Sequence, residues 1–284
     1  MIYLPIIGAL ALASATIMEK FILRRKKIDA KTFQTAVFFA AVLVMIPLMF
    51  FFYRLDPLAF QTKNLLIFAG VILASFFANV CLFYAIKWEK ISNLEPALIL
   101  EPLFTVLLAI LFSFFVSGLY ERNLTVIIPA IIAGLALVFS HIKKHHLEFN
   151  KYFLAAIIGS FLFALELVMS RLILDYYSPL SFYFFRCAFV FILSFLIFSP
   201  KITKIKPNKI RWLMLLTGAL WVLFRVIVYY GYLVLGVIST TLIVMLGPVF
   251  VYIFARVFLK EKLDWRNIVA SIVIVACVLY VLLV

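Results

Sequence analysis

The chain has 284 residues, of which 67% are hydrophobic and only 13% are charged, about half the charged fraction of an ordinary soluble domain. This composition excludes a disordered chain, and it excludes a soluble monomer, which rarely exposes so much apolar surface. The net charge of +14 would suggest nucleic acid as the partner of a soluble protein, but basic residues also gather in the cytoplasmic loops of membrane proteins. We therefore predict an integral membrane protein without a nucleic-acid partner.

Apolar segments that could cross a bilayer as helices follow one another along the whole chain. A span needs about 20 apolar residues, and ten segments come close to or exceed this length, joined by short connections. The ten predicted spans cover residues 3–23, 33–53, 64–86, 93–117, 124–140, 152–174, 179–198, 211–235, 238–259 and 266–284. The sequence therefore predicts an all-α, multi-pass protein of the cell membrane with ten transmembrane helices and no soluble domain.

The two halves of the chain resemble each other. An offset of 151 residues aligns Gly8 with Gly159, and an offset of 146 residues aligns Pro102 with Pro248. Each half holds five spans, and an odd number of spans inverts the second half relative to the first. The predicted domains are a first repeat over residues 1–142, a linker over 143–150 and a second repeat over 151–284. Inverted five-helix repeats are typical of secondary transporters.

Basic residues are distributed unequally between the two sides of the membrane. The connections that follow odd-numbered spans carry 18 Lys and Arg residues, whereas those that follow even-numbered spans carry three. Basic connections remain in the cytoplasm. The count therefore predicts that the mid-chain linker is cytoplasmic and that both termini lie outside the cell.

Three segments resemble the EamA-type carriers of the drug/metabolite transporter superfamily. The signature of helices three and four appears as Leu82-Phe-Tyr-Ala-Ile followed by Leu94-Glu-Pro-Ala-Leu-Ile-Leu-Glu-Pro-Leu-Phe, and the second half repeats it between Tyr230 and Phe250. Phe258-Leu-Lys-Glu-Lys-Leu resembles the family's Leu-Gly-Glu element between helices nine and ten. The first half has Phe115-Val-Ser-Gly-Leu without a glutamate, so we expect the element to be missing there.

The resemblance covers the whole chain and implies a fold, an activity and an orientation. It implies ten helices in two EamA repeats, and the export or exchange of small metabolites such as amino acids, nucleobases and drugs, often driven by the proton gradient. It also implies cytosolic termini, which conflicts with the orientation that the charge count predicts. The absolute orientation therefore stays open between these two expectations.

Four charged residues lie near the middle of predicted spans: Glu101, Glu166, Arg186 and Arg225. Each would cost about 2.5–3.5 kcal/mol if it faced lipid, so we expect the four to face one polar cavity, lined by helices one, three, four, six, eight and nine. Two buried ion pairs that only join helices are the structural alternative. In a proton-driven carrier, Glu101 or Glu166 would gain and lose the proton. Glu19 is a weaker candidate because it lies nearer the end of its span.

The eighth span has a face that resembles the wall of a binding pocket. Trp221, Arg225 and Tyr229 are spaced four residues apart and share one side of a helix. The corresponding face of the third span has Asn79 at its centre. We predict that Arg225 contacts the solute, most simply through a carboxylate, and that Asn79 contributes from the opposite wall. Packing of the aromatic side chains, or contact with lipid, is the alternative for this face.

Prolines occupy matching positions near the middle of the fourth and ninth spans. Pro102 and Pro248 cannot donate a backbone hydrogen bond, and each leaves a carbonyl group one turn earlier without its donor. Free backbone groups at this depth are tolerated where they line a cavity or are buried in protein. We predict that both helices break here, with a simple kink as the alternative.

Motifs of enzymes and of cofactor sites are absent from the sequence. GxSxG, HExxH and the phosphate-binding GxxxxGK(S/T) do not occur. The three cysteines lie in apolar spans without a CxxC pair, which is typical of buried structural cysteines. We therefore predict no catalytic residue, no metal site and no cofactor.

These observations predict a secondary active transporter of a small organic solute, such as an amino acid, a nucleobase or another metabolite or drug. Alternating access is the expected mechanism and export the expected direction, with proton coupling as an option. An uncoupled uniporter or obligate exchanger of the same fold is the alternative, and a membrane-embedded enzyme acting on a lipid-linked substrate is a remote one. The expected partners are the solute, the bilayer and, in a coupled carrier, protons, for a monomer or a homodimer.

Overall fold

The computed structural model describes residues 3–23, 28–89, 91–116, 118–141, 150–200, 208–250 and 265–283. Its regular elements there are all helices, apart from one isolated antiparallel bridge between Leu55 and Tyr177. The helices of the first half are α1 (Tyr3–Leu23), α2 (Ala30–Phe52), η1 (Pro57–Phe60), α3 (Thr62–Trp88), α4 (Ile91–Leu98), α5 (Leu100–Phe115) and α6 (Leu124–His141). Those of the second half are α7 (Lys151–Arg171), η2 (Leu174–Tyr176), α8 (Pro179–Phe198), α9 (Asn208–Val234), α10 (Val237–Val244) and α12 (Trp265–Leu283).

Ten apolar helical segments cross the molecule, as the sequence predicts. Eight are long and apolar enough to cross a membrane, and two shorter apolar helices cover Leu124–Ser140 and Val237–Phe250. Where both ends of a span are described, its bounds differ from the prediction by at most three residues. The all-α membrane fold with ten helices is therefore confirmed, while the linker over 143–150 lies outside the described residues except for Asn150.

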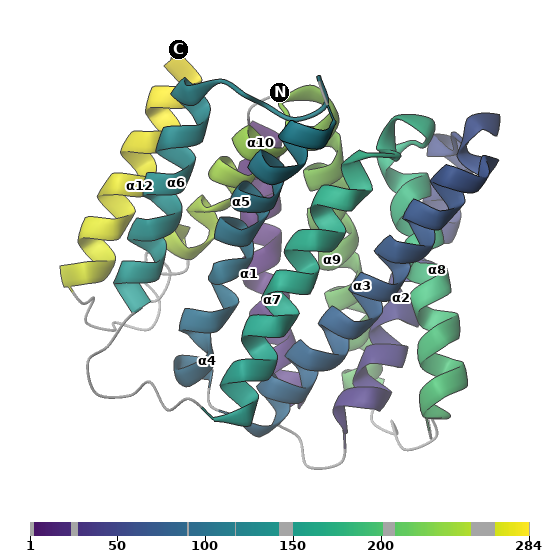
Figure 1. Ribbon diagram of the computed structural model, residues 1–284. Helices are drawn as coiled ribbons and strands as arrows, with labels where there is room; N and C mark the ends of the chain where they lie inside the picture. The colour runs from purple at the N-terminus through teal and green to yellow at the C-terminus, as the bar shows by residue number, and fades with distance from the viewer. Residues whose placement is uncertain are drawn as a thin grey trace.

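The two halves run in opposite directions through the fold (Figure 1). α1 leads away from the side on which both chain ends lie, whereas α7 leads toward that side. α1 packs along α9 and α3 packs along α7, while α2 packs against α8 and α6 against α12. A two-fold pseudosymmetry that exchanges α1 with α7 and α3 with α9 converts the α1–α9 pair into the α7–α3 pair. It also maps the α2–α8 pair and the α6–α12 pair onto themselves. The helix contacts therefore agree with an inverted repeat.

The fourth and ninth spans are both interrupted near their prolines. The break falls at Ile99 between α4 and α5, and at Met245 after α10. Each lies three residues before a proline, Pro102 or Pro248. The carbonyl group that each proline leaves without a donor belongs to the last residue of α4 or of α10. The helix therefore breaks next to the unpaired carbonyl and not at the proline itself.

Connections from the two halves pair with each other on the side of the chain ends (Figure 1). The backbone N–H of Asp56, between α2 and α3, donates to the carbonyl of Tyr176 at 2.8 Å, and the N–H of Ser178 donates to the carbonyl of Arg54 at 3.1 Å. The N–H of Arg54 also donates to Ser181 Oγ at 3.0 Å. Backbone pairing thus joins the two repeats at this side.

A glutamate of the first half caps a helix of the second half. Glu121 lies between α5 and α6, and its two carboxylate oxygens accept hydrogen bonds from the backbone N–H groups of Val237 and Ser239, each at 3.0 Å. These are N–H groups at the start of α10, which an acidic side chain stabilises. The preceding Gly236 has φ +91°, and a Cβ there would lie 2.2 Å from Glu121 Oε1.

The expectation that the first half lacks the glutamate of the family element was therefore wrong. The segment Leu119-Tyr-Glu121 supplies it just beyond the residues compared. Tyr120 beside it is buried and donates its hydroxyl group to the carbonyl of Val168 at 2.7 Å. Burial raises the pKa of Tyr120 above its ordinary value, although the nearby Arg171 opposes this shift. The second element, around Glu261, lies outside the described residues.

Candidate functional site

Four helices bring the four predicted intramembrane charges together. Glu101 comes from α5, Glu166 from α7, Arg186 from α8 and Arg225 from α9. Arg186 Nη1 lies 3.4 Å from Glu166 Oε1, and Arg225 Nη1 lies 3.9 Å from Glu166 Oε2. Arg225 Nη2 lies 3.8 Å from Glu101 Oε1. Glu166 therefore bridges both arginines, and the charges form one chain of four and not two separate pairs.

Each nitrogen of the Arg186 guanidinium donates a hydrogen bond. Its Nε and Nη2 donate to Ser75 Oγ at 3.1 and 2.8 Å, and its Nη1 donates to the hydroxyl of Tyr229 at 2.9 Å. That hydroxyl in turn donates to Glu166 Oε1 at 2.7 Å. A buried charge is tolerated when it is paired and hydrogen-bonded in this way. This part of the site is a hydrogen-bonded network that joins α3, α7, α8 and α9.

Arg225 is equally buried, at 1% exposure, but its environment differs. Its Nε and Nη1 atoms have no hydrogen-bond partner among the described residues, and neither does Glu166 Oε2. Aromatic rings surround its guanidinium carbon, with the centroids of Phe163, Phe224 and Trp221 at 5.2, 5.4 and 5.6 Å. Cation–π contacts stabilise a guanidinium without using its N–H donors. Arg225 therefore keeps donors that another acceptor could use.

A pocket with a cavity volume of about 20 Å³ adjoins both arginines. Its lining comes from five helices, and it is mainly apolar and aromatic with a few polar groups, as is usual for small-molecule sites. The lining residues are Val37, Phe38, Ala41, Asn79, Phe83, Phe163, Tyr183, Arg186, Trp221 and Arg225. Two of these helices, α2 and α8, were not expected in the lining, whereas α1, α5 and α10 were expected and do not line this pocket. The predicted helix set was wrong because α2 packs closely on α9 and reaches the site.

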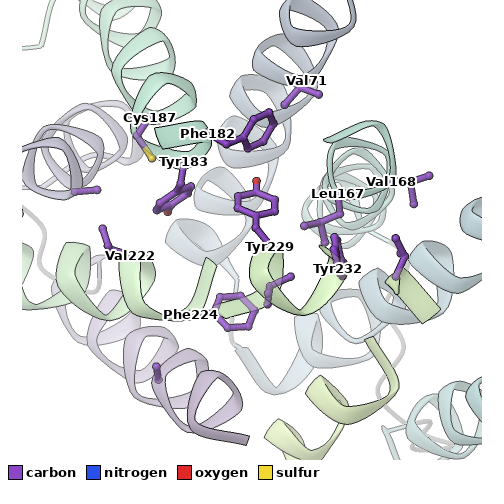
Figure 2. Packing of buried hydrophobic residues seen from close by; sticks show 14 of the residues in the cluster. Val71, Leu167, Val168, Phe182, Tyr183, Cys187, Val222, Phe224, Tyr229 and Tyr232 are labelled. Atoms are coloured by element: carbon purple, nitrogen blue, oxygen red, sulfur yellow. The ribbon is translucent and has the colours of Figure 1, made fainter. Parts of the chain in front are cut away.

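The remaining predicted site residues separate into two groups. Trp221 and Asn79 line the pocket, and Asn79 Nδ2 also donates to the carbonyl of Ser75 within α3 at 2.7 Å. Tyr229 shares a helix face with Arg225 but is fully buried and bonded to Arg186 and Glu166. Figure 2 shows its ring among other buried aromatic side chains. Tyr229 therefore supports the charged network and does not line the pocket.

Two further residues take part: Ser75, which the sequence did not single out for the site, and Glu19, which was only a weaker candidate there. Ser75 accepts two hydrogen bonds from Arg186, and the only signal for this role was its place one turn from Asn79 on the same helix face. Glu19 of α1 is buried, and its carboxylate accepts a hydrogen bond from the indole N–H of Trp221. Among the described residues no group of three His, Cys, Asp or Glu side chains could hold a metal ion.

Aromatic side chains cover the site on the side of the chain ends. Ring centroids of Phe182 and Tyr229 lie 5.1 Å apart, those of Tyr177 and Phe182 5.3 Å, and those of Phe68 and Tyr177 5.9 Å. Burial raises the pKa of Tyr177, which lies between α7 and α8. The pocket lining includes Val37, near the start of α2, and Phe83, near the end of α3.

One family and a set of solved structures match this chain. Residues 150–283 match the EamA-like transporter family. Of 28 matching chains of solved structures, one crystal structure aligns with a TM-score of 0.71 and covers 99% of this chain and 96% of its own, at 18% identity; this likeness shows the fold alone. No curated protein matches the sequence significantly. The second half of this multi-pass membrane protein, residues 150–283, is therefore similar to the EamA-like transporter family.

Proposed function

We propose that this protein is a secondary transporter that exports a small organic solute by alternating access, and that the solute carries a carboxylate or another anionic group beside an apolar body. The observation that carries this proposal is Arg225, a buried cation with two nitrogens that lack hydrogen-bond partners, in the wall of an aromatic pocket. A guanidinium binds a carboxylate through two parallel hydrogen bonds, and apolar walls accommodate the rest of the molecule.

Glu101 is the group that a solute anion would replace. It is 25% exposed and lies 3.8 Å from Arg225, beyond the distance of a hydrogen bond. Glu166 is fully buried and accepts a hydrogen bond from Tyr229, so it is held more firmly. Binding of the solute carboxylate to Arg225 would release Glu101 and leave the network around Arg186 intact. Arg225 would then exchange its weak ion pair with Glu101 for a bidentate pair with the solute.

The paired connections supply the element that changes during transport. Backbone pairing and contacts between aromatic rings lie on the side of the chain ends, and the pocket includes Val37 and Phe83, which belong to the halves of α2 and α3 nearer the basic connections. If the basic side is cytoplasmic, this arrangement corresponds to a carrier that receives its solute from the cytoplasm, and breaking the pairing would open the other side. An uncoupled uniporter or an obligate exchanger would use the same two states, and only a driving pH gradient distinguishes a proton-coupled carrier from them.

Purified protein in liposomes tests the proposal. Amino acids and other small carboxylates, together with their amides as uncharged controls, are first screened for thermal stabilisation of the protein, because a ligand of the folded state raises its stability. Stabilising compounds are then assayed for counterflow. We expect carboxylates to stabilise and to exchange, and their amides to do neither. Equal stabilisation by acids and amides would contradict the anionic solute, and stabilisation without counterflow would support a membrane-embedded enzyme or a sensor.

A further inference from the structure

Glu19 is a buried carboxylate that lacks a basic partner among the described residues. Its exposure is 3%, and its hydrogen bond comes from the indole N–H of Trp221. The ion pairs within 4 Å involve Glu101, Glu166 and Asp175, and none involves Glu19. An ionised carboxylate in such a place is costly because one neutral donor compensates for its lost hydration. Glu19 therefore differs from the two carboxylates that face arginines.

The charged groups of the neighbouring helices do not remove this cost. α1 packs against α3, α9 and α10. On α9, the charged residue of the site is Arg225, which lies over the face of the Trp221 ring, whereas Glu19 bonds to the N–H at the ring edge. On α3, Lys87 Nζ donates to the carbonyls of Leu23 and Ile28 at 3.1 and 2.7 Å. The charge of Asp29 attracts the same ammonium group. α10 has no charged residue.

Trp221 connects Glu19 to the pocket. The indole N–H at the edge of its ring donates to Glu19, while the centroid of the ring lies 5.6 Å from the guanidinium carbon of Arg225. The same side chain lines the pocket. A change in the bond to Glu19 therefore acts on the ring that covers Arg225.

We propose that Glu19 is the proton-binding site of this carrier, and that its protonation state sets the position of the Trp221 ring over Arg225. The proposal rests on the transport function proposed above. A proton from water adds to the carboxylate of Glu19 and converts a charge-assisted hydrogen bond into a neutral one, which is about half as strong. The ring is then held less firmly and can move, which gives the solute access to Arg225. Loss of the proton restores the bond.

Fluorescence of Trp221 tests the proton site without any solute. The other three tryptophans, Trp88, Trp212 and Trp265, are exposed on the outer surface and are replaced by Phe, which leaves Trp221 as the reporter. We expect its emission to change with pH in one step, and Glu19→Gln to abolish that step. Glu101→Gln, which removes a partly exposed carboxylate of the same site, should leave the step in place. A step that survives Glu19→Gln, a step lost in Glu101→Gln, or no step in the parent protein would overturn the proposal.

Transport by the same variants separates proton coupling from transport itself. Liposomes with a mixture of radiolabelled amino acids are assayed for counterflow and for accumulation driven by a pH gradient. Glu19→Gln should lose the accumulation and keep the counterflow. Trp221→Phe, which removes the donor to ionised Glu19, should move the midpoint of the pH profile to higher pH, which a merely structural role would not do. Accumulation that persists in Glu19→Gln contradicts the proton site. Absence of counterflow in the wild type contradicts the transport proposal. In that case the pH dependence of Trp221 fluorescence still tests whether Glu19 binds the proton.

Discussion

Two buried arginines lie side by side in the site, and they differ in how their donors are used. Every nitrogen of the Arg186 guanidinium has a hydrogen-bond partner, whereas two nitrogens of Arg225 have none among the described residues. Buried polar groups without a partner are uncommon and call for a physical explanation. A saturated group contributes to stability, and an unsaturated one has bonds to offer to a solute. This difference supports the proposal that Arg186 has a structural role and that Arg225 binds the solute.

Arg225→Lys should weaken the apparent solute affinity at least tenfold, about 1.4 kcal/mol, because an ammonium group cannot form the bidentate pair of a guanidinium. The concentration dependence of counterflow measures this loss. Arg171→Lys is the matched control, since Arg171 pairs with Asp175 at 2.7 Å and does not line the pocket. If Arg225 only neutralises Glu101, the double variant Arg225→Met with Glu101→Leu should restore both stability and transport. That restoration would exclude solute binding by Arg225.

Tyr229→Phe should destabilise the protein by about 1–3 kcal/mol, because it removes both the acceptor of Arg186 Nη1 and the hydroxyl donor to the buried Glu166. Thermal unfolding of the purified protein detects this as a lower midpoint. Tyr280→Phe on α12 is the control for the same chemical change at an exposed position, and it should leave the midpoint unchanged. Equal midpoints for the two variants would show that the Tyr229 hydroxyl does not hold the network.

Helices α2 and α9 approach each other so closely that backbone touches backbone. A Cβ on Gly218 of α9 would lie 2.9 Å from the backbone nitrogen of Ala41 and 3.1 Å from the carbonyl carbon of Ala40. Small residues permit such contacts between membrane helices. Since backbone atoms cannot rotate away, only a larger separation of the two helices would admit a side chain. This contact brings α2 to the pocket, where Ala41 forms part of the wall.

Gly218→Ala should therefore cost about 1–3 kcal/mol, the usual penalty for overpacking, and it should weaken solute binding by displacing the α2 wall. Gly247→Ala provides the same substitution at a position where the nearest atom lies 3.6 Å from the new Cβ, which is an ordinary contact. We expect its unfolding midpoint to match that of the wild type. Thermal unfolding and ligand-induced stabilisation measure both effects, and a tolerated Gly218→Ala would mean that α2 and α9 can separate without loss.

The elements were more predictable from the sequence than their contacts. Hydropathy indicates the ten spans because the bilayer imposes a minimum length on each of them. The two helix breaks fall three residues before Pro102 and Pro248 because proline removes a donor at a defined distance along the helix. The bridging role of Glu166 depends instead on the rotation and height of each helix, which hydropathy does not contain. The capping of α10 by Glu121, 116 residues away, was missed for the same reason.

At the scale of the whole molecule, the fold is nearly symmetric while the site is not. Three of the four central charges belong to the second half, and Arg225 corresponds to the uncharged Asn79 under the offset of 146 residues. Alternating access requires two backbone arrangements of similar energy, which the inverted repeat supplies. It does not require the charges to be duplicated. In the proposed mechanism, the asymmetric site would bind one solute in one orientation, while the symmetric scaffold would present it to either side.

The absolute orientation of the scaffold decides whether the pocket receives its solute from the cytoplasm. The 18 basic residues of the odd-numbered connections against three elsewhere predict that the side opposite the chain ends is cytoplasmic, whereas the family resemblance implies cytosolic termini. Single cysteines in a background without the three native ones distinguish these orientations. Gln61 and Lys151 are both exposed and lie on opposite sides of the fold. Neither residue lines the pocket.

We expect an impermeant thiol reagent to label Gln61→Cys in intact cells and to label Lys151→Cys only after the membrane has been permeabilised. Asn150 is a less suitable position, since its side chain caps α7 through the N–H groups of Tyr152 and Phe153. The reverse labelling pattern would place the basic connections outside the cell. Access from the side of those connections, as proposed above, would then bring the solute from outside, and import would replace export as the direction to test.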